Sequence, residues 1–278
     1  MPYSKSSDPA ELRRIARKLR VDIVRMIHKA GSGHPGGSLS VIDILVALYF
    51  SEMNYRPDDP DWPGRDRLVL SKGHACSALY AVFSEIGLYP PDEIWTFRQM
   101  GSPYQGHPEM TMTRGIEFPT GSLGQGLSGA NGMALAARLD GKSWRVYCIL
   151  GDGECQEGEV WEAAMTAAHH RLDNVCAIVD HNKVQQTGEV AEIKNIAPLA
   201  EKWRAFGWHA IEVDGHRFEE LLPALAEAER TKGRPTVIIA HTVKGKGVSF
   251  MEGDPGFHGK APDDEQLRRA LAELEAEK

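Results

Sequence analysis

Apolar residues along this chain either recur with helical spacing or gather into short, strand-like runs. Residues 11–30 carry a helical repeat of apolar positions, and similar patterns predict helices at residues 77–86, 126–139, 157–172, 195–206, 218–230 and 262–278. Short, mainly apolar runs that contain β-branched or aromatic residues predict strands at residues 68–70, 144–150, 175–179, 209–213 and 236–240. Helices that alternate with strands predict an α/β fold, namely a doubly wound, mainly parallel sheet with helices on both faces.

The connections between these elements contain neither an internal repeat nor a low-complexity linker. We therefore expect a single domain over residues 1–278. Within it, residues 1–10 form a polar leader, near whose end Asp8 and Pro9 indicate a helix start, and residues 262–278 form a charged, peripheral helix.

Composition argues against several classes of protein. The chain has 32 basic and 39 acidic residues and a net charge of −7, which offers no broad attraction for nucleic acid. It contains no run of about 18 apolar residues, so we expect no membrane span. Four cysteines without CxxC spacing, and no apolar signal at the N-terminus, favour a reducing, cytoplasmic setting over a disulfide-stapled secreted protein.

The stretch at residues 144–186 predicts a strand, a helix and a second strand. Asp152 follows the first strand in a Gly-Asp-Gly turn, and Asn182 follows the second strand. Because a parallel crossover brings the carboxyl ends of both strands to the same edge of the sheet, we expect Asp152 and Asn182 to lie side by side. A carboxylate, an amide oxygen and a nearby carbonyl suit magnesium, while the glycines and the following helix N-terminus suit a diphosphate. The sequence therefore predicts a magnesium and diphosphate site.

Glycine motifs elsewhere carry less information. A Gly-Asp-Gly tripeptide alone is more often an ordinary turn, and it is the strand, helix and distant Asn182 that favour the diphosphate interpretation. Two GxGxxG matches, beginning at Gly31 and Gly124, are not dinucleotide fingerprints, because neither follows a strand.

Several histidines and one basic loop are further candidates for chemistry. A histidine in a loop is usually solvent-exposed, but four of them in glycine-rich segments favour a functional role: His34, His74, His107 and His258. His74 is also expected to cap the helix at residues 77–86. The loop at residues 241–247 leaves the last strand at the same sheet edge, and its lysines either meet a phosphate or remain solvated.

Ordered motifs from about Leu12 to Lys260 give the chain a resemblance to the N-terminal, thiamine-diphosphate-binding half of transketolases. These motifs are SGHPG, LSKGHA, GHPE, TGSLGQG, GDGECQEG, DHNKVQ, HTVKGKG and FHGK. The resemblance implies the thiamin-diphosphate-binding fold, with thiamine diphosphate and Mg²⁺ as cofactors.

The resemblance also implies a set of cofactor ligands. Asp152, the side chain of Asn182 and the carbonyl of Val184 match the magnesium ligands. Residues that match contacts to the diphosphate, the thiazolium ring or the rest of the thiamine are His74, Gly121, Leu123, Gly153, Lys244 and His258.

Substrate and assembly residues follow from the same resemblance. His34, His107 and His258 match histidines that face the sugar, stabilise developing charge and move protons. Glu157 and Glu162 match glutamates of a network that links paired active sites across a subunit interface. Acidic residues near a helix N-terminus are also common without such a role, because they complement the helix dipole.

The implied reaction is reversible transfer of a two-carbon ketol unit from a ketose phosphate to an aldose phosphate, with the cofactor carrying the bond-breaking chemistry. Transketolases hold the pyrimidine of the cofactor and most of the sugar phosphate with a further domain that these 278 residues do not include. We therefore expect a split enzyme whose partner, a C-terminal transketolase subunit, completes an α₂β₂ assembly.

Other interpretations stay open. Within the enzymes they are a split transketolase-like enzyme for another ketose phosphate, such as a branched one, a 1-deoxyxylulose-5-phosphate synthase, and the α subunit of a 2-oxo acid dehydrogenase. The GHPG and SKGH segments favour a transketolase over the last two. A non-catalytic cofactor-binding module is the alternative outside the enzymes.

Overall fold

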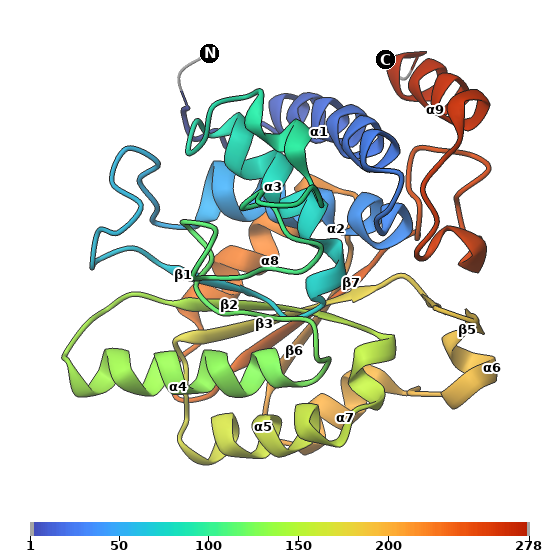
Figure 1. Ribbon diagram of the computed structural model, residues 1–278. Helices are drawn as coiled ribbons and strands as arrows, with labels where there is room; N and C mark the ends of the chain where they lie inside the picture. The colour runs from blue at the N-terminus through green and yellow to red at the C-terminus, as the bar shows by residue number, and fades with distance from the viewer. Residues whose placement is uncertain (1–2, 277–278) are drawn as a thin grey trace.

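A five-stranded parallel sheet forms the centre of the protein, as shown by a computed structural model that describes residues 3–276 (Figure 1). The strand order is β1-β2-β3-β7-β6, and every neighbouring pair is parallel. The strands are β1 (Arg67–Leu70), β2 (Val146–Gly151), β3 (Val175–His181), β6 (His209–Asp214) and β7 (Thr236–His241). The predicted parallel α/β sheet is therefore confirmed.

Helices cover both faces of the sheet, as predicted (Figure 1). One face carries α1 (Pro9–Ala30), α2 (Pro35–Ala47), α3 (Cys76–Glu85) and α8 (Phe218–Arg230), and the other carries α4 (Gln125–Leu139), α5 (Gly158–His169) and α7 (Leu199–Ala205). The remaining helix α6 (Val190–Lys194) follows a small hairpin of β4 (Val184–Gln185) and β5 (Gly188–Glu189). Single turns of other helix types lie at η1 (Leu48–Glu52), η2 (Gly73–Ala75), η3 (Glu93–Thr96), η4 (Gly153–Gln156) and η5 (Pro255–Phe257).

The strands separate two hydrophobic cores. Along β2, Tyr147 and Ile149 pack with the α1–α3 and α8 side, whereas Val146, Cys148 and Leu150 pack with the α4, α5 and α7 side. This alternation follows from the two-residue period of a strand. Because β1, β2, β3 and β7 are buried on both faces, they are nearly continuous apolar runs in the sequence, which is why the sequence identifies them well. The edge strand β6 is more exposed.

Helix α2 was not among the predicted elements. All its residues are buried, so it has no polar face and its sequence lacks the amphipathic period by which helices are recognised. A signal was nevertheless present, because Pro35 occupies the first turn, where proline is favoured.

Several predicted boundaries were wrong. The predicted helix at residues 195–206 begins only at Leu199, since a residue before proline is driven out of the helical region and Pro198 therefore sets the start. The predicted helix at residues 157–172 ends at His169. The helix start predicted at Asp8 and Pro9 is confirmed, because Asp8 caps α1 and Pro9 is its first residue, so α1 includes the last two residues of the leader at 1–10.

The C-terminal helix α9 (Asp264–Ala276) packs against α1 and buries Ala270 and Leu274 completely. The predicted element at residues 262–278 thus contributes to the core, although it lies at the edge of the molecule (Figure 1). Residues 1–2 and 277–278 of the predicted leader and helix lie outside the described residues. Of the helices between residues 3 and 276, none combines the length and apolar character that a membrane span requires.

Candidate active site

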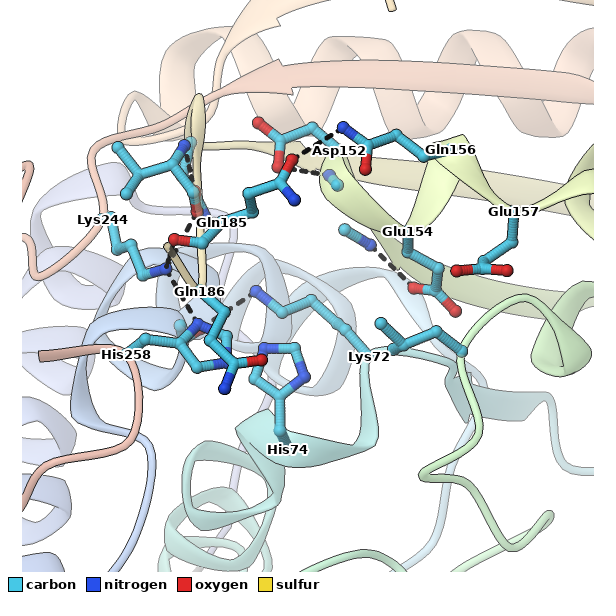
Figure 2. A pocket seen from close by; sticks show the side chains of 16 residues that line it. Lys72, His74, Asp152, Glu154, Gln156, Glu157, Gln185, Gln186, Lys244 and His258 are labelled. Carbon is cyan, nitrogen blue, oxygen red and sulfur yellow. Dashed lines mark hydrogen bonds between the residues drawn. The ribbon is translucent and has the colours of Figure 1, made fainter. Parts of the chain in front are cut away.

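The carboxyl ends of β1, β2, β3 and β7 meet at one edge of the sheet and line a cavity of about 190 Å³ (Figure 2). In the sheet register Gly151 lies opposite Asp180, and His181 lies opposite His241, so the segments that follow these strands start at the same level. The side chains that line the cavity include Lys72, His74, Leu123, Asp152, Glu154, Gln156, Glu157, Asn182, Val184, Gln185, Gln186, Lys244 and His258.

Asp152 and Asn182 share this cavity, as the strand order requires. The Asp152 carboxylate is 2 % exposed and accepts hydrogen bonds from the backbone amides of Gly153, at 2.7 Å, and Lys183. The Asn182 Oδ1 accepts from the backbone amide of Val184 at 3.1 Å. Burial and the nearby Asp180 carboxylate raise the pKa of Asp152 to about 6. This carboxylate therefore lies where a cation would relieve an unfavourable charge.

The residues expected to hold magnesium fit such an ion. A carboxylate, an amide oxygen and a carbonyl are hard oxygen donors, and magnesium bound by few protein ligands keeps positions for phosphate oxygens. The Val184 carbonyl accepts a hydrogen bond from the Lys244 ammonium at 2.9 Å, so it already faces positive charge in the cavity. Within residues 3–276 no group of three or more His, Cys, Asp or Glu side chains forms a separate metal cluster.

Two buried lysines at the site differ in their partners. Lys72 forms an ion pair with Asp180, which is fully buried and also accepts hydrogen bonds from the hydroxyls of Ser40 and Thr242. Lys244 has no carboxylate partner in the described part of the chain and instead contacts the Val184 carbonyl and, at 3.0 Å, the Nδ1 of His258. Burial and the neighbouring Lys72 lower the pKa of Lys244 to about 8. The Lys244 charge is thus available to an anionic ligand.

The structure brings together the four loop histidines. The ring centroids of His34 lie 5.4 Å from those of His74 and His258 and 6.1 Å from that of His107, and His74 and His258 are 5.1 Å apart. His74 does not cap the helix that follows it: α3 begins at Cys76 without a side-chain cap. The His74 ring instead turns into the cavity (Figure 2).

All four histidines are held in the neutral form at neutral pH. Burial and the Arg98 charge lower the pKa of His34 to about 4, and burial and Lys244 lower that of His258 to about 3. The pKa of His74 is lowered mainly by burial and also by the Lys72 charge. The pKa of His107 is lowered mainly by burial and also by the Arg98 charge. A neutral imidazole offers one donor and one acceptor, which suits hydrogen bonding to sugar hydroxyls and proton transfer.

The remaining expected residues lie in three different places. Leu123 and Glu157 are exposed and line the same cavity as Asp152. Gly121 lines a neighbouring cavity of about 540 Å³, where it faces the ring of His107. Glu162 lies exposed on α5 and does not line either cavity.

Sequence reasoning missed Glu154, which connects three segments of the site. Its carboxylate accepts hydrogen bonds from the backbone amides of Gly124 and Gly151, each at 2.9 Å, and from the Ser71 hydroxyl. The residue is 2 % exposed, so these bonds are made in a protected environment. Its place next to Gly153 was a signal, but nothing local reveals that its partners lie 30 and 83 residues away.

Arg98 was missed as well. Its guanidinium donates to the Ser32 hydroxyl at 2.8 Å and lies 3.4 Å from the Nδ1 of His34. It thereby contributes to the lowered pKa values of His34 and His107. The loop that carries it has no apolar period, so no local pattern distinguished this residue from other loop arginines.

Comparisons with known proteins show which domain family this chain resembles. Residues 11–277 match the family model described as "Transketolase, thiamine diphosphate binding domain". The chain is 46 % identical over 272 residues to the 6-deoxy-6-sulfo-D-fructose transketolase subunit SqwG of Clostridium sp. (strain MSTE9), an alignment that covers 98 % of this chain and 99 % of the relative. It is 40 % identical over 259 residues to one of the subunits of the apulose-4-phosphate transketolase of Phocaeicola vulgatus, covering 93 % and 92 % of the two chains.

Solved transketolase structures have the same fold as this chain. The transketolase from Leishmania mexicana superposes with a TM-score of 0.90 at 34 % sequence identity. That comparison covers 95 % of this chain but 41 % of the solved one. The chain therefore spans less than half the length of this transketolase, while it spans nearly all of the two subunits named above.

Proposed function

Because this chain belongs to the transketolase family, through its thiamine-diphosphate-binding domain, we propose that it is the N-terminal subunit of a split transketolase dependent on thiamine diphosphate and magnesium. The reaction is the reversible transfer of a two-carbon ketol unit from a ketose phosphate to an aldose phosphate. The observation that carries the proposal is that Asp152, Asn182 and Lys244 line the same cavity. Oxygen atoms that suit a magnesium ion lie there together with the Lys244 ammonium, which has no carboxylate partner among the described residues.

The residues that line this cavity are assigned to the cofactor. Asp152, Asn182 and the Val184 carbonyl hold magnesium, and Lys244, Gly153, His74 and His258 contact the diphosphate and the thiazolium ring. Bound there, thiamine diphosphate supplies the carbanion chemistry that side chains cannot provide. The buried Lys72–Asp180 pair supports the floor of the cavity without adding net charge. Leu123, which lines this cavity, and Gly121, which lines the neighbouring one, are the proposed contacts to the rest of the thiamine.

The substrate end consists of the neutral histidines. His34, His107 and His258 donate hydrogen bonds to, or accept them from, the hydroxyls and the carbonyl of the sugar, and they hold or move a proton there. Their lowered pKa values support this role, because a neutral ring can accept a proton that an imidazolium cannot. Arg98 orients His34 through its contact with Nδ1 at 3.4 Å.

A partner chain completes the site in this proposal. The two relatives that this chain spans almost entirely are named as subunits, whereas the solved transketolase extends far beyond it. We infer that a C-terminal subunit supplies the pyrimidine-binding part and the groups that grip the sugar phosphate, in an α₂β₂ assembly. Exposed Glu157 and Glu162 are the candidates for contacts across the interface.

The substrate is proposed at the level of a class. The names of the relatives refer to 6-deoxy-6-sulfo-D-fructose and to apulose 4-phosphate, so the family accommodates a sulfonated ketose and a ketose phosphate other than the common ones. For this chain we propose a ketose that carries a terminal phosphate or sulfonate, with an aldose acceptor of the same kind.

Co-purification tests the proposal directly. The tagged chain is recovered from its source cells, and the intact mass of the complex is recorded together with ketol transfer from a panel of ketose phosphates and sulfonated ketoses. We expect a second chain, bound thiamine diphosphate and magnesium, and activity in the complex only. Turnover by the chain alone would overturn the split enzyme, whereas recovery of an inactive chain without cofactor or partner would favour a non-catalytic module.

A further inference from the structure

His216 lies outside the cavity, in the turn between β6 and α8, and its side chain is 14 % exposed. Its Nδ1 lies 2.6 Å from the Asp43 Oδ2 of α2, and its Nε2 lies 2.9 Å from the backbone nitrogen of Val243. The imidazole thus bridges a buried carboxylate on one helix and the backbone of the loop that carries Lys244.

The two contacts define the protonation state of this imidazole. A backbone N–H can only donate, so the Nε2 of His216 must accept from Val243 and carries no proton. The carboxylate of Asp43 can only accept, so the proton lies on Nδ1 and points to Asp43. His216 is therefore a neutral, Nδ1-protonated ring, and Asp43 selects this tautomer.

Asp43 is itself firmly placed. Its side chain is 5 % exposed and also forms an ion pair with Arg20 of α1, whose side chain is 8 % exposed. The turn that carries His216 packs tightly on the loop it contacts: a Cβ on Gly215 would lie 2.5 Å from the Cγ2 of Thr242. The bridge consequently joins buried and closely packed parts of the molecule.

Several hydrogen bonds hold the backbone around Lys244. The Thr242 hydroxyl donates to Asp180, the Thr242 amide to the His181 carbonyl and the Val243 amide to His216. After them, the Gly245 amide donates to the Gly36 carbonyl and the Lys244 carbonyl accepts from the Gly253 amide, each at 2.9 Å. Among these contacts, the His216 contact holds the residue immediately before Lys244. Its loss would loosen the start of the segment from which the Lys244 ammonium reaches the Val184 carbonyl.

We propose that His216, oriented by Asp43, is a positioning residue that holds the Lys244 ammonium at the diphosphate end of the site. This role rests on the proposed function, because Lys244 is assigned there to the diphosphate. His216 touches neither cofactor nor substrate and acts through the backbone of Val243.

The first test needs no cofactor. The chain is labelled with ¹⁵N-histidine, and the ring nitrogens are observed by NMR near pH 7.5, with His216→Gln used to assign the signals. We expect a neutral His216 with the proton on Nδ1. An Nε2-protonated ring or an imidazolium would contradict the bridge between Asp43 and Val243.

The second test is a double-mutant cycle with His216→Ala and Lys244→Met. It uses the full chain in complex with its co-purified partner. The measured quantity is the affinity of this complex for thiamine diphosphate in the presence of magnesium. Loss of a supporting contact typically weakens ligand binding about tenfold or more, and we expect that effect for His216→Ala. In the double variant the effect of His216→Ala should largely vanish, because both changes act on the same ammonium. If the loss of affinity in the double variant equals the product of the fold-losses in the two single variants, His216 has a general structural role and the proposal is overturned.

Control variants separate the outcomes. His209→Ala removes a comparable histidine–carboxylate pair, with 2.6 Å between His209 and Glu227, at the opposite edge of the sheet, and should leave cofactor affinity unchanged. His216→Gln retains an oxygen that can accept from Val243, so it should bind the cofactor better than His216→Ala and serves if the alanine variant does not fold. A wild-type complex that binds no thiamine diphosphate would overturn the proposed function, whereas normal binding by His216→Ala overturns only this inference.

Discussion

At the residue scale, the environment of each charge at the site determines what a substitution there will change. Replacing Lys72 would leave Asp180 as a fully buried carboxylate without a cation, which typically costs about 3–5 kcal/mol of stability. Replacing Lys244 removes an ammonium that has no carboxylate partner in the described part of the chain, so its loss should affect ligand binding more than folding.

Substitution of Asp152 tests the metal assignment. Asp152→Asn keeps an oxygen for one of the two backbone amides and removes a charge that the nearby Asp180 disfavours, so the fold should persist without cofactor. We expect magnesium to lose its effect on thiamine diphosphate binding and the complex to lose the thermal stabilisation that ligand binding confers. Isothermal titration with and without magnesium measures this effect. Asp8→Asn, which retains the exposed cap of α1, is the matched control, and equal magnesium dependence in both variants would refute the assignment.

The neutral state of His34 makes a contribution to stability that depends on pH. Burial and Arg98 lower its pKa to about 4, whereas a histidine in the unfolded chain has a pKa of about 6.5. Between these values the unfolded chain binds a proton that the folded chain does not, so this contribution is complete above about pH 6.5 and is lost as the pH falls toward about 4. His34→Gln cannot bind that proton, and its free energy of unfolding should fall less steeply over this window. Urea unfolding at several pH values measures both slopes, and identical slopes would contradict the prediction.

At the scale of elements, the site depends on the close approach of α4 to the end of β1. A Cβ on Gly126 would lie 2.3 Å from the Ser71 Oγ and 2.8 Å from its Cα, so the first turn of α4 can pack there only with glycine. The same region holds the Gly124 amide that binds Glu154. The absence of a side chain at Gly126 thus allows α4 to pack where the Gly124 amide can reach Glu154.

Two glycine substitutions in α4 should have opposite effects. Gly126→Ala should destabilise the chain by about 1–3 kcal/mol, because the methyl group overpacks against the Ser71 backbone. Gly132→Ala, in the same helix with no atom within 4 Å of the new Cβ, should stabilise it by about 0.5–1 kcal/mol. Urea unfolding of the isolated chain gives both values. A Gly126→Ala variant as stable as the wild type would contradict the close contact.

At the scale of the whole molecule, the proposed contact with another subunit lies on α5. Glu162 is exposed there, one helical turn before Met165, which is 53 % exposed, and Leu139 on the neighbouring α4 is 87 % exposed. Single exposed apolar side chains are ordinary at a protein surface, so the prediction of an interface rests on Glu162.

Substitution of Glu162 tests that surface. Glu162→Ala should change the stability of the isolated chain by no more than about 0.5 kcal/mol, because the side chain is exposed. In the assembled enzyme it should weaken the binding between subunits by at least about fivefold, as expected for an interface residue whose truncation matters. Analytical ultracentrifugation of the complex measures the effect. Glu275→Ala on α9 is the control, and equal assembly of the two variants would remove Glu162 from the interface.

The sequence by itself determined the parallel sheet and the edge at which the site lies. Strands buried on both faces are recognisable as apolar runs, and parallel crossovers place their carboxyl ends together, so the juxtaposition of Asp152 and Asn182 followed from local patterns and chain direction alone. The transketolase motifs predicted the family before any contact was known, and the family match confirms that prediction.

Only the tertiary structure decided which side chains meet. The clustering of His34, His74, His107 and His258, the ion pair of Lys72 with Asp180, and the bridge from Asp43 through His216 to Val243 all join residues from distant parts of the chain. The same holds for α2, whose helical state depends on complete burial. Local periodicity reports the environment along one element, whereas charge pairing and burial depend on which elements the fold packs together.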